Sequence, residues 1–90
     1  MYAEKKLKPG REAKEYRKAR IMELIGKVKG NRGWRSAFVE AYPEFDTVEG
    51  ARLMTTGLDG RTADPDLLAA LEEWIPQVEQ SQPDWFQKMD

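Results

Sequence analysis

The chain has 90 residues, no cysteine, no histidine and a formal net charge of −1 at pH 7. Disulfides, thiolate chemistry and zinc sites built on Cys or His are therefore excluded, and the commonest general base is missing. The charge is sorted along the chain, since residues 1–35 carry a net +8 and residues 36–90 a net −9. This asymmetry indicates a basic segment that meets a polyanion or an acidic surface, which could be the chain's own.

Ninety residues predict one small domain with a modest core. No apolar run approaches the roughly 20 residues of a membrane span, and the basic start lacks the apolar region of a secretory signal. A cytoplasmic protein without a membrane partner is expected. Glu72-Glu73 and Asp64-x-Asp66 are carboxylate pairs by proximity only. Nothing in the sequence places a desolvating pocket, a nucleophile or a metal around them, so no enzyme activity, metal or cofactor is expected.

Residues 1–11 are basic, contain Pro9-Gly10 and offer almost no apolar surface, which predicts a flexible arm. Residues 12–90 are predicted to form a single helical domain. The arm holds four candidate phosphate contacts: Lys5, Lys6, Lys8 and Arg11. The alternative is a solvated tail that keeps the protein soluble.

From Glu12 onward, apolar residues recur at helical spacing and predict a first amphipathic helix that Gly30 ends. The predicted buried stripe is Ile21, Leu24, Ile25 and Val28. After a turn at residues 31–33, a second helix is predicted from Trp34 to Pro43, which ends it because the residue before proline avoids the α region.

A third helix is predicted to begin at Asp46, as an N-cap with Glu49 as its capping-box partner. Its predicted buried face is Val48, Ala51, Met54 and Leu58. Gly50 either allows a close approach to a neighbouring helix or merely weakens the first turn.

Asp64-Pro65 is typical of a helix start, with an N-cap followed by proline at the first helical position. The leucine-rich fourth helix runs toward Pro76, which is predicted to kink or stop it. Trp85 and Phe86 either fold back on the core, which we expect, or form an exposed interaction motif. The predicted fold is all-α, a small bundle of four main helices with a flexible basic N-terminal arm.

Residues 46–75 resemble the second half of the helix-turn-helix domains of the phage-repressor-like superfamily. The likeness lies in Leu53-Met54, in the turn Leu58-Asp59-Gly60-Arg61, in Asp64-Pro65 and in the leucine-rich helix that follows. It implies a DNA-binding function with a recognition helix in the third helical segment. The connection from Ala41 to Asp46 departs from the family, because it is longer than the usual tight turn and contains proline.

Two further sets of residues are candidates for nucleic-acid contacts. Arg32 and Arg35 flank a glycine-containing turn before a helix, where backbone amides and arginines together suit phosphate, although an ordinary interhelical turn is the alternative. On the predicted outward face of the third helix and the turn after it, four side chains are candidate base contacts: Arg52, Thr55, Thr56 and Arg61.

These patterns favour a small helix-turn-helix-like DNA-binding protein, such as a transcriptional regulator or accessory factor of a bacterium, phage or mobile element. If the protein binds a specific DNA site, a homodimer is expected, because one small domain offers a single recognition helix. The alternative is a non-enzymatic interaction module, such as an inhibitor, a DNA mimic or an assembly adaptor, that binds a protein partner through its acidic half. Pairing of the two halves between chains, in a head-to-tail oligomer, also stays open.

Overall fold

The computed structural model of the protein describes residues 11–87, with the backbone alone at residues 11 and 12. Every regular element in this range is helical, which confirms the predicted all-α class of four main helices. The elements are α1 (Arg11–Gly26), α2 (Trp34–Ala41), the 3₁₀ helix η1 (Pro43–Phe45), α3 (Val48–Leu58) and α4 (Pro65–Ser81). Lys5, Lys6 and Lys8 lie outside the described residues, and so does the side chain of Arg11, whose backbone begins α1.

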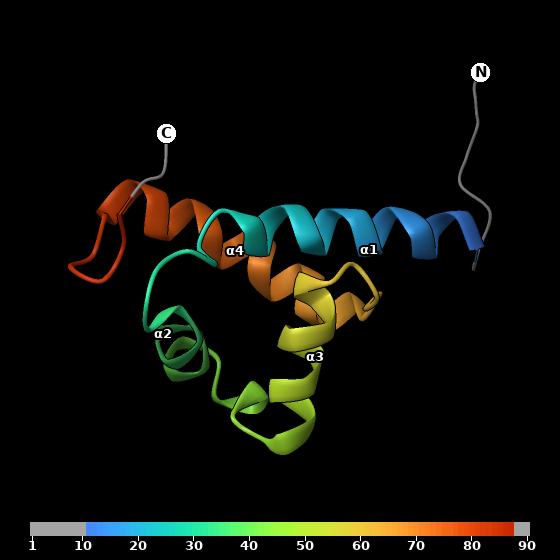
Figure 1. The fold of residues 1–90 in the computed structure, drawn as a ribbon, viewed down its shortest axis with the longest axis horizontal. Helices are drawn as coiled ribbons and strands as arrows, with labels where there is room; N and C mark the ends of the chain where they lie inside the picture. Colours follow the sequence, from blue (N-terminus) through green and yellow to red (C-terminus); the bar gives the residue numbers. More distant parts are fainter. Residues whose placement is uncertain (1–10, 88–90) are drawn as a thin grey trace.

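Helix α1 is the element against which both α3 and α4 pack, while α2 and α3 are joined through η1 (Figure 1). The predicted stripe of α1 is confirmed, because Ile21, Leu24, Ile25 and Val28 are all buried. The helix itself ends at Gly26, four residues before the predicted stop, and Val28 is buried from the turn that follows. Phe38 of α2 is fully buried and contacts the ring of Trp74 edge-on, at 5.2 Å between centroids.

The start of α3 differs from its prediction. Thr47 caps the helix, since its side-chain oxygen accepts a hydrogen bond from the Gly50 amide at 2.9 Å, while Asp46 ends η1. The α3 backbone lies directly on η1 at Gly50, where an added Cβ would come within 2.6 Å of the Phe45 carbonyl carbon. Gly50 therefore allows a close approach, which is the first of its two predicted roles.

This close approach rotates the buried face of α3. Gly50, Met54 and Gly57 are buried, whereas the predicted core residues Val48 and Ala51 are exposed. Helical periodicity of large apolar side chains does not indicate the two glycines, because a glycine makes its contacts through backbone atoms.

Helix α4 begins as predicted, because the Asp64 carboxylate accepts a hydrogen bond from the Leu67 amide at 2.9 Å. It does not stop at Pro76 but continues to Ser81. Pro76 is exposed, and the buried residues Trp74, Ile75 and Val78 hold the helix to the core on both sides of it. Gln82, at φ 49°, ends the helix in the left-handed conformation.

The chain then folds back on the core, as expected. Trp85 stacks on Trp74 with 5.7 Å between ring centroids and 14° between planes, and Phe86 is buried. The C-terminal aromatic pair is therefore part of the core and its edge.

Candidate nucleic-acid interface

The basic half of the chain partly meets its own acidic half. Arg20 of α1 pairs with Glu72 of α4 at 3.1 Å, and Lys27 pairs with Glu79 at 3.6 Å. The hydrogen bonds to Glu72 and Glu23 raise the pKa of Arg20 above its usual value. Charges on α1 and on the start of the turn after it are thus compensated along α4, within one chain.

The turn between α1 and α2 holds cations without such partners. Lys29, Arg32 and Arg35 line a hollow of about 450 Å³ at the start of α2, and none of them forms an ion pair with another residue in the part of the chain that the structure describes. Gly33, at φ 88°, allows the tight turn into the helix. The positive end of the α2 dipole adds to the three side-chain charges, so the hollow suits an anion.

A buried asparagine fixes the shape of this turn. Asn31 is 6% exposed; its Nδ2 donates to the Val28 carbonyl at 3.4 Å, and its Oδ1 accepts from the Gln87 amide at 2.6 Å. The segment after α4 therefore stabilises the basic turn through the Gln87 amide. No local sequence signal predicts this contact, since it joins residues 56 positions apart.

The exposed face of α3 lies next to the basic turn. Arg35, whose guanidinium lies over the Trp34 ring at 5.3 Å, donates a hydrogen bond from Nη1 to Thr55 Oγ1 at 3.0 Å. Arg52 lies one turn before Thr55 on α3 and pairs with Glu49 at 3.2 Å. Both side chains of that pair are about two-thirds exposed, and such pairs contribute on the order of 0–1 kcal/mol, so Arg52 can exchange its partner readily.

The structure separates the other two candidates from this group. Thr56 is half-buried, donates to the Arg52 carbonyl and is hydrogen-bonded to the buried Thr62 hydroxyl, so it braces the end of α3 instead of pointing outward as predicted. Arg61 is exposed in the turn after α3 and pairs with Asp59 at 3.0 Å. Of the predicted contacts, Arg35, Arg52 and Thr55 share one surface, with Arg32 in the adjoining turn.

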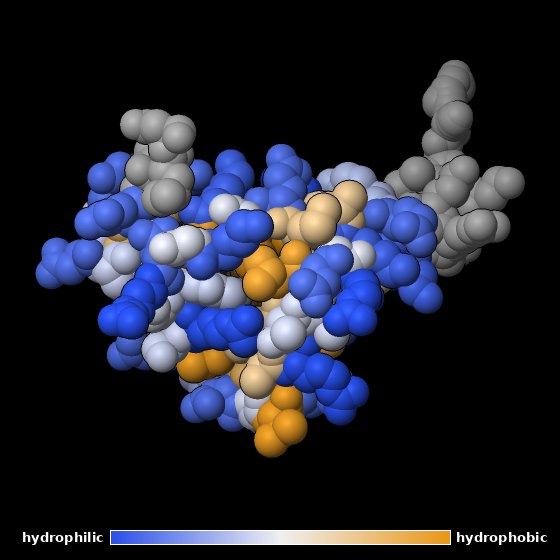
Figure 2. All heavy atoms as spheres, in the orientation of Figure 1, coloured by the Kyte–Doolittle hydropathy of each residue, from blue (hydrophilic) through white to orange (hydrophobic). Residues whose placement is uncertain are grey.

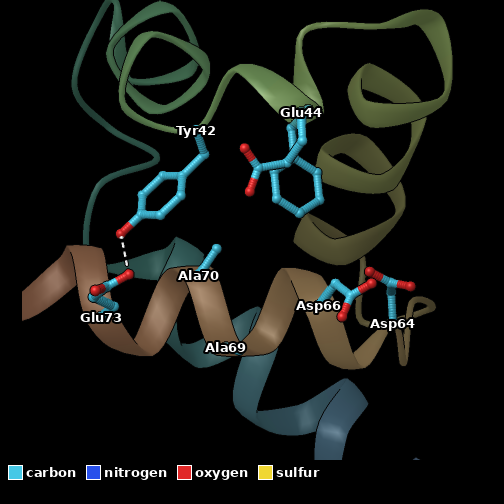
Figure 3. A pocket seen from close by; sticks show the side chains of 8 residues that line it. Tyr42, Glu44, Asp64, Asp66, Ala69, Ala70 and Glu73 are labelled. Atoms are coloured by element: carbon cyan, nitrogen blue, oxygen red, sulfur yellow. Dashed lines mark hydrogen bonds between the residues drawn. The ribbon is translucent and has the colours of Figure 1, made fainter.

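A second hollow, of about 430 Å³, is acidic and lies between η1 and α4. It is lined by Tyr42, Phe45, Ala69 and Ala70 and by the carboxylates of Glu44, Asp64, Asp66 and Glu73. Figure 3 shows Asp64 and Asp66 at one end and Tyr42 with Glu73 at the other. The Tyr42 hydroxyl donates to Glu73 at 2.8 Å, and burial together with that carboxylate raises the pKa of Tyr42 to about 12.

Among residues 11–87, no group of three or more acidic side chains is arranged to hold a metal ion. The helices in this range are all too short or too polar to cross a membrane. Comparisons of the chain with protein-family models, with curated proteins and with solved structures found no match.

Proposed function

We propose that the protein is a small DNA-binding protein of the helix-turn-helix kind, in which α3 enters the major groove while the turn before α2 contacts phosphates. The observation that carries the proposal is the hydrogen bond between Arg35 and Thr55. It joins the cationic turn and the exposed face of α3 into one surface. Proteins with this motif use such an arrangement, in which phosphate contacts orient the helix and side chains on the helix contact base edges.

The distribution of paired and unpaired charge supports the same surface. Arg20 and Lys27 are held by carboxylates of α4, whereas Lys29, Arg32 and Arg35 line the basic hollow without carboxylate partners among the described residues. A phosphate near the turn would meet cations that need not first release a carboxylate. None of the residues that line the acidic hollow also lines the basic one.

The test is a fluorescence-anisotropy titration of a random-sequence duplex at 50 and 200 mM salt. Replacing Lys29 and Arg32 by alanine removes two phosphate contacts, which together account for about a tenfold loss of affinity over that salt range. The matched control replaces Lys18 and Lys27, which removes the same charge from α1 and the start of the turn. We expect the first double variant to bind more weakly and to reduce the salt dependence, and the control to resemble the wild type.

Absence of binding at low salt, or equal effects of the two double variants, would refute the proposal. A protein that binds a two-fold symmetric site would do so as a homodimer, with one α3 in each half-site. Mobility-shift titrations with a full site and with a half-site test this part of the proposal.

The acidic hollow favours a second candidate, a module that binds a basic protein segment. Four carboxylates line this hollow, none of its described lining residues is Lys or Arg, and the remaining lining residues are aromatic or alanine. Alanine at Glu44 and Asp66 would abolish such binding, whereas it would leave DNA affinity unchanged or raise it by removing negative charge. These opposite directions distinguish the two functions.

A further inference from the structure

The most exposed large apolar side chain among the described residues is at the start of α3. Val48, the first residue of the helix, is 86% exposed, compared with 52% for Tyr16 and 45% for Met22. Figure 2 shows apolar atoms at the lower tip of the molecule with hydrophilic residues on either side, and this tip is the end where α3 begins in Figure 1. The fold gives this side chain no packing role.

Contacts of its chain neighbours fix the backbone on both sides of Val48. On one side Thr47 caps the helix through the Gly50 amide, and on the other Gly50 packs against the backbone of Phe45. A valine in a helix has one strongly preferred rotamer, so its two methyl groups point in a fixed direction. A fixed, exposed apolar group loses little conformational entropy when it is covered.

The neighbours of Val48 are those of the proposed recognition surface. Arg52 lies four residues further along α3, a rise of about 6 Å, and Thr55 follows at the point where Arg35 joins the surface. Since base pairs are spaced about 3.4 Å apart, side chains separated by 6 Å along a helix in the groove meet base pairs about two steps apart.

On this basis, and resting on the proposed DNA-binding function, we infer that Val48 contacts the C5 methyl group of a thymine in the major groove. The thymine methyl is the apolar group that the major-groove edges of the four bases present, so a valine held there selects it. The preferred site then carries a thymine about two base pairs from the base contacted by Arg52, and guanine is the base that arginine contacts most often.

The test uses the full chain and a duplex selected by it from a random-sequence library. Each thymine of the selected duplex is replaced in turn by uracil, which removes the methyl group and keeps every hydrogen-bonding atom. We expect uracil at one position to weaken binding of the wild type about fourfold, which is the effect of one buried methyl group. The Val48→Ala variant should bind the thymine duplex and the uracil duplex with equal affinity. Val48→Thr, which keeps the shape but only one methyl group, should be intermediate.

The outcomes separate this inference from the function on which it rests. If the chain binds a selected duplex but tolerates uracil everywhere, or if Val48→Ala stays as sensitive as the wild type, the thymine contact is refuted while DNA binding stands. If no duplex is bound, both are refuted. If Val48→Ala instead abolishes concentration-dependent self-association without changing the sensitivity of binding to uracil, Val48 packs in an interface with a second copy of the chain, and the inference is overturned.

Discussion

Replacement of Gly50 by alanine tests whether the contact between α3 and η1 sets the position of the proposed recognition helix. An added Cβ would lie 2.6 Å from the Phe45 carbonyl carbon and 2.8 Å from its Cα. Both are backbone atoms, so the clash is relieved only if the helix moves away from η1. Overpacking of this kind costs about 1–3 kcal/mol, and because backbone must shift we expect the upper end.

The intrinsic preference of helices for alanine over glycine opposes this loss with a gain of about 1 kcal/mol, which leaves a net loss of about 2 kcal/mol. At 4–8 °C per kcal/mol for a domain of this size, the melting temperature should fall by roughly 10 °C in a circular-dichroism melt. The matched control is Gly26→Ala at the end of α1, where an added Cβ meets nothing within 4 Å and stability should hold or rise. A Gly50→Ala melting temperature equal to or above that of the wild type would refute the packing argument.

Three further predictions concern binding, helix geometry and pH. Arg52→Ala should reduce the preference for a selected duplex over a random one by about 1–3 kcal/mol, whereas removal of residues 1–10 should weaken binding to the selected and the random duplex alike. If the two changes have equal effects in a competition titration, the base contact of Arg52 and the phosphate contacts of residues 1–10 are contradicted. Pro76→Ala should raise the melting temperature, because alanine restores the hydrogen bond that proline cannot donate and removes the clash of the proline ring with the preceding turn, a combined gain of up to about 3 kcal/mol. A fall in the melting temperature would show that proline is needed there. Because the pKa of Tyr42 is raised from 10.0 to about 12 in the folded protein, its contribution to stability is present below pH 10 and should be lost as pH rises through 12. Tyr42→Phe should remove both this loss and the last step of tyrosine ionisation in a 295 nm absorbance titration. If that last step persists in the variant, it belongs to another tyrosine.

Much of the fold follows from local sequence chemistry. Asp64-Pro65 starts a helix because a carboxylate cap and a proline at the first helical position act within four residues of chain, and the structure has that cap. Pro43 ends α2 for an equally local reason. The stripe from Ile21 to Val28 is buried because spacing alone determines which side of α1 is apolar.

The predictions that failed depend on contacts between elements. Either Asp46 or Thr47 can cap a helix, and η1 decides between them because it uses Asp46 as its own C-terminal cap. The buried face of α3 turns toward Gly50 because a backbone-to-backbone contact with Phe45 is available, which an analysis of apolar side chains does not detect. In the same way, Arg35 could be named from the sequence as a phosphate contact, but its bond to Thr55 depends on how α2 and α3 meet.

The bond between the Gln87 amide and Asn31 makes the order of synthesis matter for the basic turn. The ribosome completes Asn31 long before Gln87, so a growing chain carries the cations of the turn without the contact that shapes it. The hollow at the basic turn gains this contact only after α4 and the segment that follows it have emerged. A partly synthesised chain therefore carries the positive charge of the turn before the contact that fixes the shape of the turn can form, and that contact becomes possible only once Gln87 has left the ribosome.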